Sequence, residues 1–201
     1  MQKFFILVAA ILATFGLKAQ DKYAAYITPS GNFEYAGEIV TSGTKEELQT
    51  KVKEWFMTSY TNYSKDGVID GDINVGEFTI RGTFMSKQSY NPFAGSFTDN
   101  TTYLFKVKVE PDKISFKIYN VKITTTYVGW TANNTTKDLS EEVQKLTDAR
   151  KALSDLEQEN KPSKKAMKEQ KEIIKDQEEI LDNIIPKLKG LIDSFEKEMK
   201  K

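Results

Sequence analysis

Residues 103–123, YLFKVKVEPDKISFKIYNVKI, contain two runs of alternating large apolar and polar residues separated by a turn sequence. Alternation of this kind is typical of strands that bury one face. Pro111 presets a backbone angle suited to a turn and cannot donate a ladder hydrogen bond, so we expect the chain to reverse between Glu110 and Lys113. The stretch therefore predicts an antiparallel hairpin with one face on a hydrophobic core.

The apolar positions change phase within the second run. Ile114, Phe116 and Ile118 share one parity, whereas Val121 and Ile123 share the other. Because successive side chains of a strand point to opposite faces, the two halves would otherwise bury opposite faces. A β-bulge near Tyr119 or Asn120 would restore a single buried face.

The sequence upstream supplies one helix and three further strands. Thr44 to Glu47 has the form of a capping box, and the apolar residues that follow it recur at helical spacing. These apolar residues are Leu48, Val52, Trp55, Phe56 and Tyr60. The predicted elements are a strand at 33–40, a helix at 45–60, and strands at 68–73 and 78–84. The fold class predicted is α+β, with a curved antiparallel sheet of about five strands in β-α-β-β-β-β order and helices on one face.

Residues 138–201 are rich in charged residues, leucine and isoleucine, and predict a long helical hairpin that turns at Lys161-Pro162. Five residues recur at strict seven-residue intervals, as in a two-helix or coiled-coil seam. They are Met167, Ile174, Leu181, Leu188 and Phe195. Pro186 interrupts this pattern without changing its phase, so we expect a kink and not an end. We expect the hairpin and the sheet to bury separate faces, and the protein to be a monomer in which any dimerisation is weak.

Residues 1–19 have the three-part form of a secretory signal peptide. Lys3 is followed by the apolar run from Phe4 to Phe15 and by the small residue Ala19 near the expected cut. This apolar run is too short for a membrane span. We therefore expect an exported protein, periplasmic or secreted, with a sheet domain at 21–136, a helical tail at 138–201 and no transmembrane span.

The composition excludes several chemistries. The chain has no cysteine and no histidine, which removes disulfides, cysteine nucleophiles, histidine bases and the usual zinc sites. Lys and Arg number 29, as do Asp and Glu, so no net positive charge favours nucleic acid as a partner. We expect no cofactor.

The first module resembles a known family. The resemblance rests on the phrase 35–40 (YAGEIV), the helix opening 45–48 (KEEL) with Trp55, and the phrase 80–83 (IRGT). They are similar to a family of exported Bacteroidota proteins known as a domain of unknown function with a TATA-binding-protein-like fold. The resemblance covers roughly residues 33–127. It implies a curved antiparallel sheet with helices on one face, and it implies no catalytic residues.

Two patterns resemble functional sites only in part. Asp70, Asp72 and Asn74 are spaced like the start of a calcium loop, but Val75 and Arg81 stand where that loop needs glycine and glutamate. We therefore expect polar hairpin residues and no metal site. Ser86 and Lys87 are adjacent in sequence, and adjacent residues do not face one another on a strand, so we expect no serine-lysine catalytic pair.

The segment 86–98 is too long for a simple hairpin turn and carries three aromatic residues. Long loops inside compact domains are often functional, although its aromatic rings could instead cover the sheet edge or one end of the core. The candidate residues for binding a partner or ligand are Tyr90, Phe93, Phe97 and Trp130. The sequence predicts a non-enzymatic module that binds a protein or another component of the cell envelope. The alternative is a carrier that holds a small lipophilic ligand between sheet and helix.

Overall fold

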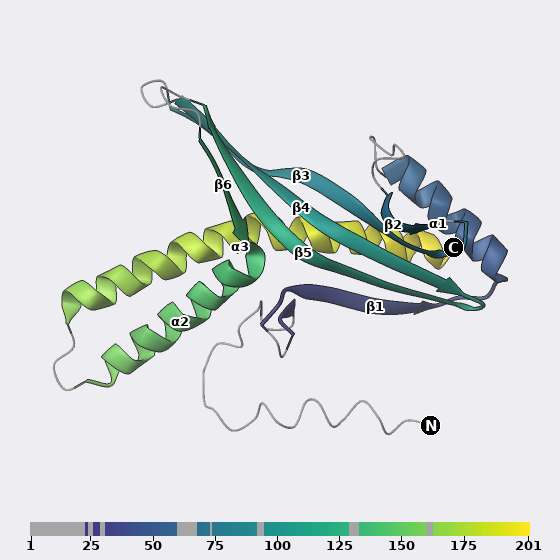
Figure 1. Cartoon of the computed structure of the whole chain (residues 1–201). Coiled ribbons are helices and arrows are strands. Elements are labelled where there is room, and N and C mark those ends of the chain that lie inside the picture. Colours follow the sequence, from purple (N-terminus) through teal and green to yellow (C-terminus); the bar gives the residue numbers. More distant parts are fainter. Residues whose placement is uncertain are drawn as a thin grey trace.

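An antiparallel sheet of six strands and three helices make up the part of the chain that the computed structural model describes (Figure 1). The described residues are 23, 26–28, 31–59, 68–72, 74–91, 95–128, 133–159 and 163–201. The elements in chain order are β1 (Glu34–Val40), α1 (Lys45–Ser59), β2 (Val68–Asp72), β3 (Glu77–Asn91), β4 (Gly95–Glu110), β5 (Lys113–Val128), β6 (Asn133–Asp138), α2 (Leu139–Glu157) and α3 (Lys164–Met199). The α+β class and the antiparallel sheet predicted from the sequence are confirmed.

Three long strands form the centre of the sheet. The strand order is β1-β5-β4-β3-β2, and β6 pairs with the half of β5 that β1 leaves open. The predicted turn between β4 and β5 is present, with Glu110 opposite Lys113 and Asp112 in the left-handed region (φ 58°). β1 pairs only with residues 113–119 of β5, and β2 only with residues 77–80 of β3. The other halves of β3, β4 and β5, here called the distal halves, therefore extend well beyond β1 and β2 (Figure 1).

The predicted bulge in β5 is confirmed at Asn120. This residue adopts a positive φ of 52°, and the register with β4 shifts between Thr102, which faces Lys122, and Leu104, which faces Tyr119. The extra residue keeps Ile118 and Val121 both buried, although they differ in parity. The bulge therefore lets the whole of β5 present its apolar residues to one face.

The capping box of α1 forms as predicted. The backbone N–H of Thr44 donates to Glu47 Oε2 (2.8 Å), and the N–H of Glu47 donates to Thr44 Oγ1 (3.3 Å). The hydrogen bonds from Thr44 also hold the pKa of the Glu47 carboxyl below its ordinary value. The helix buries Leu48, Val52, Trp55 and Phe56 against the sheet.

The last half of α3 belongs to the same hydrophobic core as the sheet and α1. The ring of Phe195 lies 4.9 Å from Trp55, 5.3 Å from Phe105 and 5.6 Å from Phe116, measured between ring centroids. Leu188, Ile192 and Met199 join the same cluster. The expectation that the helical tail and the sheet bury separate faces is wrong, because β4 and β5 carry more apolar surface than the short α1 can cover.

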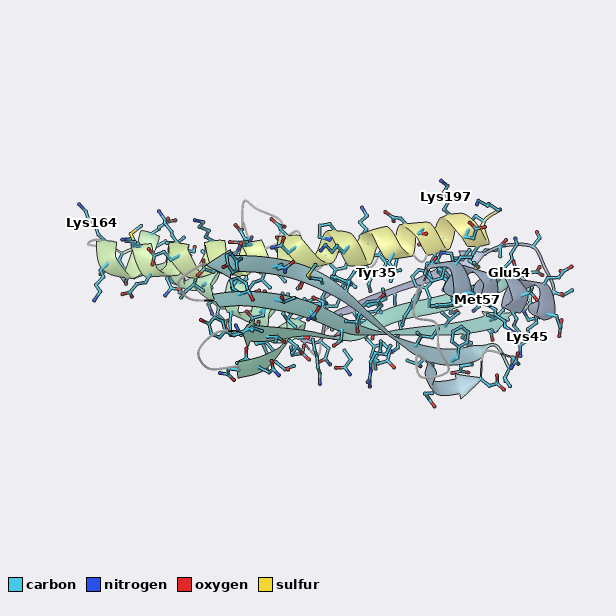
Figure 2. The ribbon with its side chains drawn as sticks, turned by 90° about the horizontal axis from the view of Figure 1, so that it is seen from above. Tyr35, Lys45, Glu54, Met57, Lys164 and Lys197 are labelled. Atoms are coloured by element: carbon cyan, nitrogen blue, oxygen red, sulfur yellow. The ribbon has the colours of Figure 1, made fainter. Side chains whose placement is uncertain are left out.

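The rest of α3 forms a hairpin with α2, as predicted. Asp138 and Ser163 cap the two helices, and Arg150 of α2 pairs with Glu178 of α3 at 2.7 Å. Pro186 lies inside α3, which continues through it. Figure 2 shows α3 running along one side of the sheet, from Lys164 at its projecting end to Lys197 beside α1.

Two parts of the sheet were not predicted correctly. The segment 86–98 is not a long loop, because β3 continues to Asn91 and β4 begins at Gly95. A register shift between Met85 and Lys87 and many polar residues hide the strand alternation there. The short strand β6 was missed, because its sequence NNTTKD has no apolar residue to signal a strand.

Tyr23 ties the start of the described chain to the middle of α3. Its side chain is buried, and its hydroxyl donates to Asp182 Oδ1 at 2.6 Å. Further along, the backbone N–H of Phe33 donates to Ser140 Oγ at the start of α2. These contacts join the chain before β1 to both long helices.

Candidate functional site

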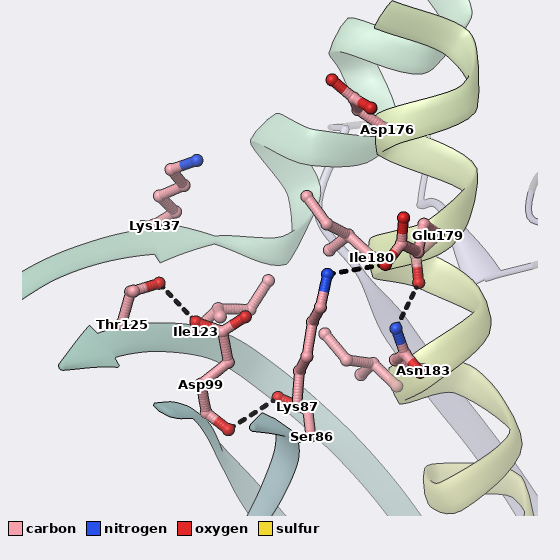
Figure 3. A pocket seen from close by; sticks show the side chains of 11 residues that line it. Ser86, Lys87, Asp99, Ile123, Thr125, Lys137, Asp176, Glu179, Ile180 and Asn183 are labelled. Carbon is pink, nitrogen blue, oxygen red and sulfur yellow. Dashed lines mark hydrogen bonds and ion pairs between the residues drawn. The ribbon is translucent and has the colours of Figure 1, made fainter. Parts of the chain in front are cut away.

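A polar cleft lies where the distal halves of the long strands meet the middle of α3 (Figure 3). Its volume is about 210 Å³. The lining residues come from β3, β4, β5, β6 and α3, and they are Ser86, Lys87, Asp99, Ile123, Thr125, Lys137, Asp176, Glu179, Ile180, Asn183 and Ile184. Most of them are charged or can form hydrogen bonds, and Ile123, Ile180 and Ile184 add an apolar part, so the cleft suits a ligand that carries polar groups.

The irregularity in β3 places both Ser86 and Lys87 at the cleft. The register shift between Met85 and Lys87 leaves Ser86 as the extra residue of a bulge. We expected adjacent residues to point apart, but a bulge changes the direction of the side chains around it. Ser86 Oγ donates to the carbonyl oxygen of Asp99 (3.0 Å), and Lys87 bonds to α3. The two side chains therefore share a site without forming a serine-lysine couple.

Side-chain hydrogen bonds among β3, β4 and β5 fix the sheet wall of the cleft. Thr125 Oγ1 donates to Asp99 Oδ1 at 2.6 Å, and Thr101 Oγ1 donates to Ser86 Oγ at 2.9 Å. Thr101 and Ser86 are buried. Because a buried hydroxyl costs free energy unless it is paired, this network stabilises one arrangement of the wall.

Two lysines connect the sheet wall to α3. Lys87 Nζ donates to Glu179 Oε1 at 2.6 Å, and this bond, followed by the lysine charge, lowers the pKa of the Glu179 carboxyl. Lys187 Nζ donates to the carbonyl oxygen of Met85 at 2.8 Å. Asn183 Nδ2 donates to the carbonyl oxygen of Glu179 (2.8 Å). The bonds of Lys87 and Lys187 therefore hold α3, which forms the other wall of the cleft, against the bulge of β3.

Beside the cleft, a carboxylate is fully buried at the start of α2. Glu142 Oε1 accepts from Lys145 Nζ at 2.6 Å, whereas Oε2 has no hydrogen-bond partner among the described residues. The Nζ of Lys137, a residue that lines the cleft, lies 4.0 Å from Oε2. Lys137 is therefore shared between the cleft and the buried carboxylate.

Two of the four predicted site residues, Tyr90 and Phe97, lie in the part of the chain that the structure describes. Tyr90 is 75 % exposed on β3 and stands in register with Ser96, which faces Val128 on β5. Phe97 is half-buried and directly follows Ser96 on β4. Because successive side chains of a strand point to opposite faces, Phe97 points to the opposite face from Ser96 and from its partner Tyr90. Phe93 and Trp130 lie outside the described residues.

Phe97 is not among the lining residues of the cleft, but it contacts one of them, Lys87. Its ring centroid lies 5.6 Å from Lys87 Nζ, within the range of a cation–π contact. Asp176, Glu179 and Asn183 were missed, because helical spacing shows that residues share a face of α3 but not which part of the sheet that face meets. Asp99 was missed because the start of β4 was expected to be a loop. The sequence signal that was available is the helical spacing of Asp176, Ile180 and Asn183, which places them on one face of α3.

In the described part of the chain, no group of three or more acidic side chains is placed to hold a metal ion. Asp72 accepts hydrogen bonds from the backbone and side chain of Asn74 (2.8 and 2.9 Å), as a polar hairpin residue does.

None of the helices of the described residues combines the length and hydrophobicity that a membrane span needs.

Two solved structures are similar to the described architecture. One is a DUF4468 family protein from Bacteroides ovatus, with 13 % identity, a TM-score of 0.44, and coverage of 81 % of this chain and 89 % of that one. The other is a TBP-like protein from Parabacteroides distasonis, with 10 % identity, a TM-score of 0.47, and coverage of 84 % and 96 %. Their names agree with the resemblance noted from the sequence, and at this level of similarity they indicate nothing about binding. No family model and no curated protein matches the chain.

Proposed function

We propose that this chain is an exported, non-enzymatic module of the bacterial cell envelope that binds a protein partner at the cleft and at the strand ends beside it. Export is supported by the signal-like residues 1–19. The observation that carries the binding role is the polar cleft between β3 and α3, next to strands that project beyond the helices (Figure 1). The exposed Tyr90 lies on these projecting strands.

A protein partner fits better than a lipophilic ligand. The space between sheet and helices is filled by the rings of Trp55, Phe56, Phe105, Phe116 and Phe195. The cleft beside them is polar and has a volume of about 210 Å³. A ligand pocket typically has a volume of ~300–1,000 Å³ and is lined mainly by apolar groups. The carrier alternative therefore has less support.

The non-enzymatic part of the proposal rests on the hydrogen bonds of the cleft. The hydroxyl of Ser86 bonds to a backbone carbonyl, and the ammonium group of Lys87 bonds to Glu179. A serine nucleophile needs a base within hydrogen-bond reach, and the partners of Ser86 Oγ are the carbonyl oxygen of Asp99 and the hydroxyl of Thr101, neither of which is a base at neutral pH. The same groups can exchange these bonds for bonds to the side chains of a partner.

Site-specific photo-crosslinking tests this proposal. A photo-reactive amino acid replaces Tyr90 in the exported protein, and a control carries it at Val40, which is 79 % exposed at the far end of β1. We expect one discrete crosslinked protein from position 90 in intact cells, and loss of that product when Lys87→Ala and Asp99→Ala are added. Equal products from both positions, or none from position 90, would contradict the proposed surface.

A further inference from the structure

Four lysines form a line along the projecting half of α3. Lys164, Lys168, Lys171 and Lys175 are all exposed. At ~100° per residue they fall within an arc of about 60° on the helix surface. We call these four residues the lysine stripe. A shallow hollow of about 440 Å³ follows the stripe, with Met167 in its lining. Glu172 also lines the hollow and pairs with Lys168 at 3.8 Å, so the lysine stripe is a mainly basic surface with one acidic residue and an apolar part.

The other helix of the hairpin carries a matching acidic line. Glu141, Asp148 and Asp155 are exposed on α2 at strict seven-residue intervals, and they fall within an arc of about 40°. We call these three residues the acidic stripe. Leu146 is buried in the hydrophobic core, and Asp148 follows it by two residues, about 200° further round α2. The acidic stripe therefore points away from α3.

The two stripes have the same repeat but cannot meet within one hairpin. Lys164 and Lys171, like Lys168 and Lys175, are seven residues apart, which is ~10.5 Å along a helix. The acidic stripe has this same repeat. Because it lies on the far side of α2, the lysine stripe of the same copy cannot reach it. A second copy of the chain presents the complementary charge at the matching spacing.

We propose that the lysine stripe on α3 docks the acidic stripe on α2 of a second copy of this chain. The contact is heterologous, since it joins two different surfaces. It uses the charged outside of the hairpin and leaves the apolar seam between α2 and α3 within one copy. Its strength depends on salt, because exposed charges are screened beyond ~10 Å at ~0.1 M ionic strength. It is separate from the binding surface proposed at the cleft.

Charge exchange tests this docking in the full mature chain. The first variant is Lys164→Glu with Lys171→Glu, which leaves the Lys168–Glu172 contact (3.8 Å) intact. The second variant is Asp148→Lys with Asp155→Lys. A control with the same charge change elsewhere on α3 is Lys189→Glu with Lys197→Glu, where both residues are exposed. Circular dichroism establishes that each variant is folded before sedimentation velocity is measured.

We expect the parent and the control to sediment faster as concentration rises at ~10 mM salt, and this effect to shrink at ~0.15 M salt, where screening is stronger. Each charge variant alone should stay monomeric. An equal mixture of the two variants should associate again, because the first keeps the acidic stripe and the second keeps the lysine stripe.

Three outcomes would overturn the proposal. The parent could remain monomeric at ~10 mM salt, where screening is weak. The mixture could fail to associate although each variant is folded. Or the parent could bind vesicles of phosphatidylglycerol and phosphatidylcholine through the lysine stripe without self-association, which would make an anionic lipid surface the occupant.

Discussion

At the residue scale, Trp55 shows how one side chain joins three elements. It lies on α1, its ring contacts Phe105 of β4 and Phe195 of α3 edge-on, and its Nε1–H donates to Ser194 Oγ at 3.3 Å. Edge-to-face contacts add to the free energy gained from apolar burial. A single truncation at this position therefore weakens helix-to-sheet and helix-to-helix packing together.

We predict that Trp55→Ala lowers the free energy of unfolding by ~3–5 kcal/mol, as expected for the loss of a large buried aromatic side chain. Met57→Ala, two residues away on the exposed side of α1, is the control and should change little. Urea denaturation followed by circular dichroism measures both. Similar midpoints for Trp55→Ala and the parent would show that this ring does not hold the core.

Two glycines should respond to the same substitution with opposite sign. A Cβ on Gly82 of β3 would overlap the ring of Tyr103 opposite it on β4, whereas a Cβ on Gly190 of α3 meets nothing within 4 Å. We predict that Gly82→Ala lowers stability by ~1–3 kcal/mol through overpacking. Gly190→Ala should raise stability by ~0.5–1 kcal/mol, because alanine favours the helix. Thermal melts of the two variants should shift in opposite directions, and a Gly82→Ala variant that melts at or above the temperature of the parent would contradict the packing at Gly82.

At the scale of elements, the contact between β3 and α3 depends on pH. The pKa of Glu179 lies below its ordinary value of 4.5 because Lys87 donates a hydrogen bond to it. A carboxyl with a lowered folded-state pKa stabilises the fold above its ordinary pKa, and this contribution is lost as pH falls through the folded pKa. The Lys87–Glu179 bond should therefore persist at neutral pH and open in acid.

We predict that Lys87→Ala raises the pKa of Glu179 towards 4.5. The measurement is an NMR titration of the side-chain carboxyl carbon of Glu179 in the parent and the variant. Glu47 of α1, whose pKa is lowered by its hydrogen bonds from Thr44, is the internal control and should titrate equally in both proteins. An unchanged titration of Glu179 would place Lys87 away from it in solution.

Elements with strong local patterns could be predicted, and elements defined by distant partners could not. The capping box at Thr44, the turn at Pro111 and the bulge at Asn120 each carry a signal within a few residues. By contrast, β6 has only polar side chains and forms because the open edge of β5 pairs with it. The cleft depends on where α3 crosses the sheet, which no local pattern encodes. The contact between Phe97 and Lys87, a lining residue of the cleft, likewise results from the fold and not from a local pattern.

At the scale of the whole molecule, α3 unites the two parts that the sequence seemed to separate. Its last half fills the core between β4, β5 and α1, and its first half pairs with α2 beyond the sheet (Figure 1). The heptad pattern of α3 runs through both environments without a break, so it could not show where the partner changes from sheet to helix. The cleft lies at this change of partner, and the position of α3 therefore determines the candidate site.

The most direct test of this account is hydrogen–deuterium exchange of the β4 backbone amides in Phe195→Ala. If the end of α3 completes the core of the sheet, removing this ring lowers global stability by ~3–5 kcal/mol, and exchange across β4 should accelerate on the order of a hundredfold or more. Ile173→Ala, on the projecting half of α3, is the matched control and should leave β4 exchange unchanged. If Phe195→Ala instead accelerates exchange within α3 alone and β4 keeps its protection, the sheet holds its own core and the account is contradicted.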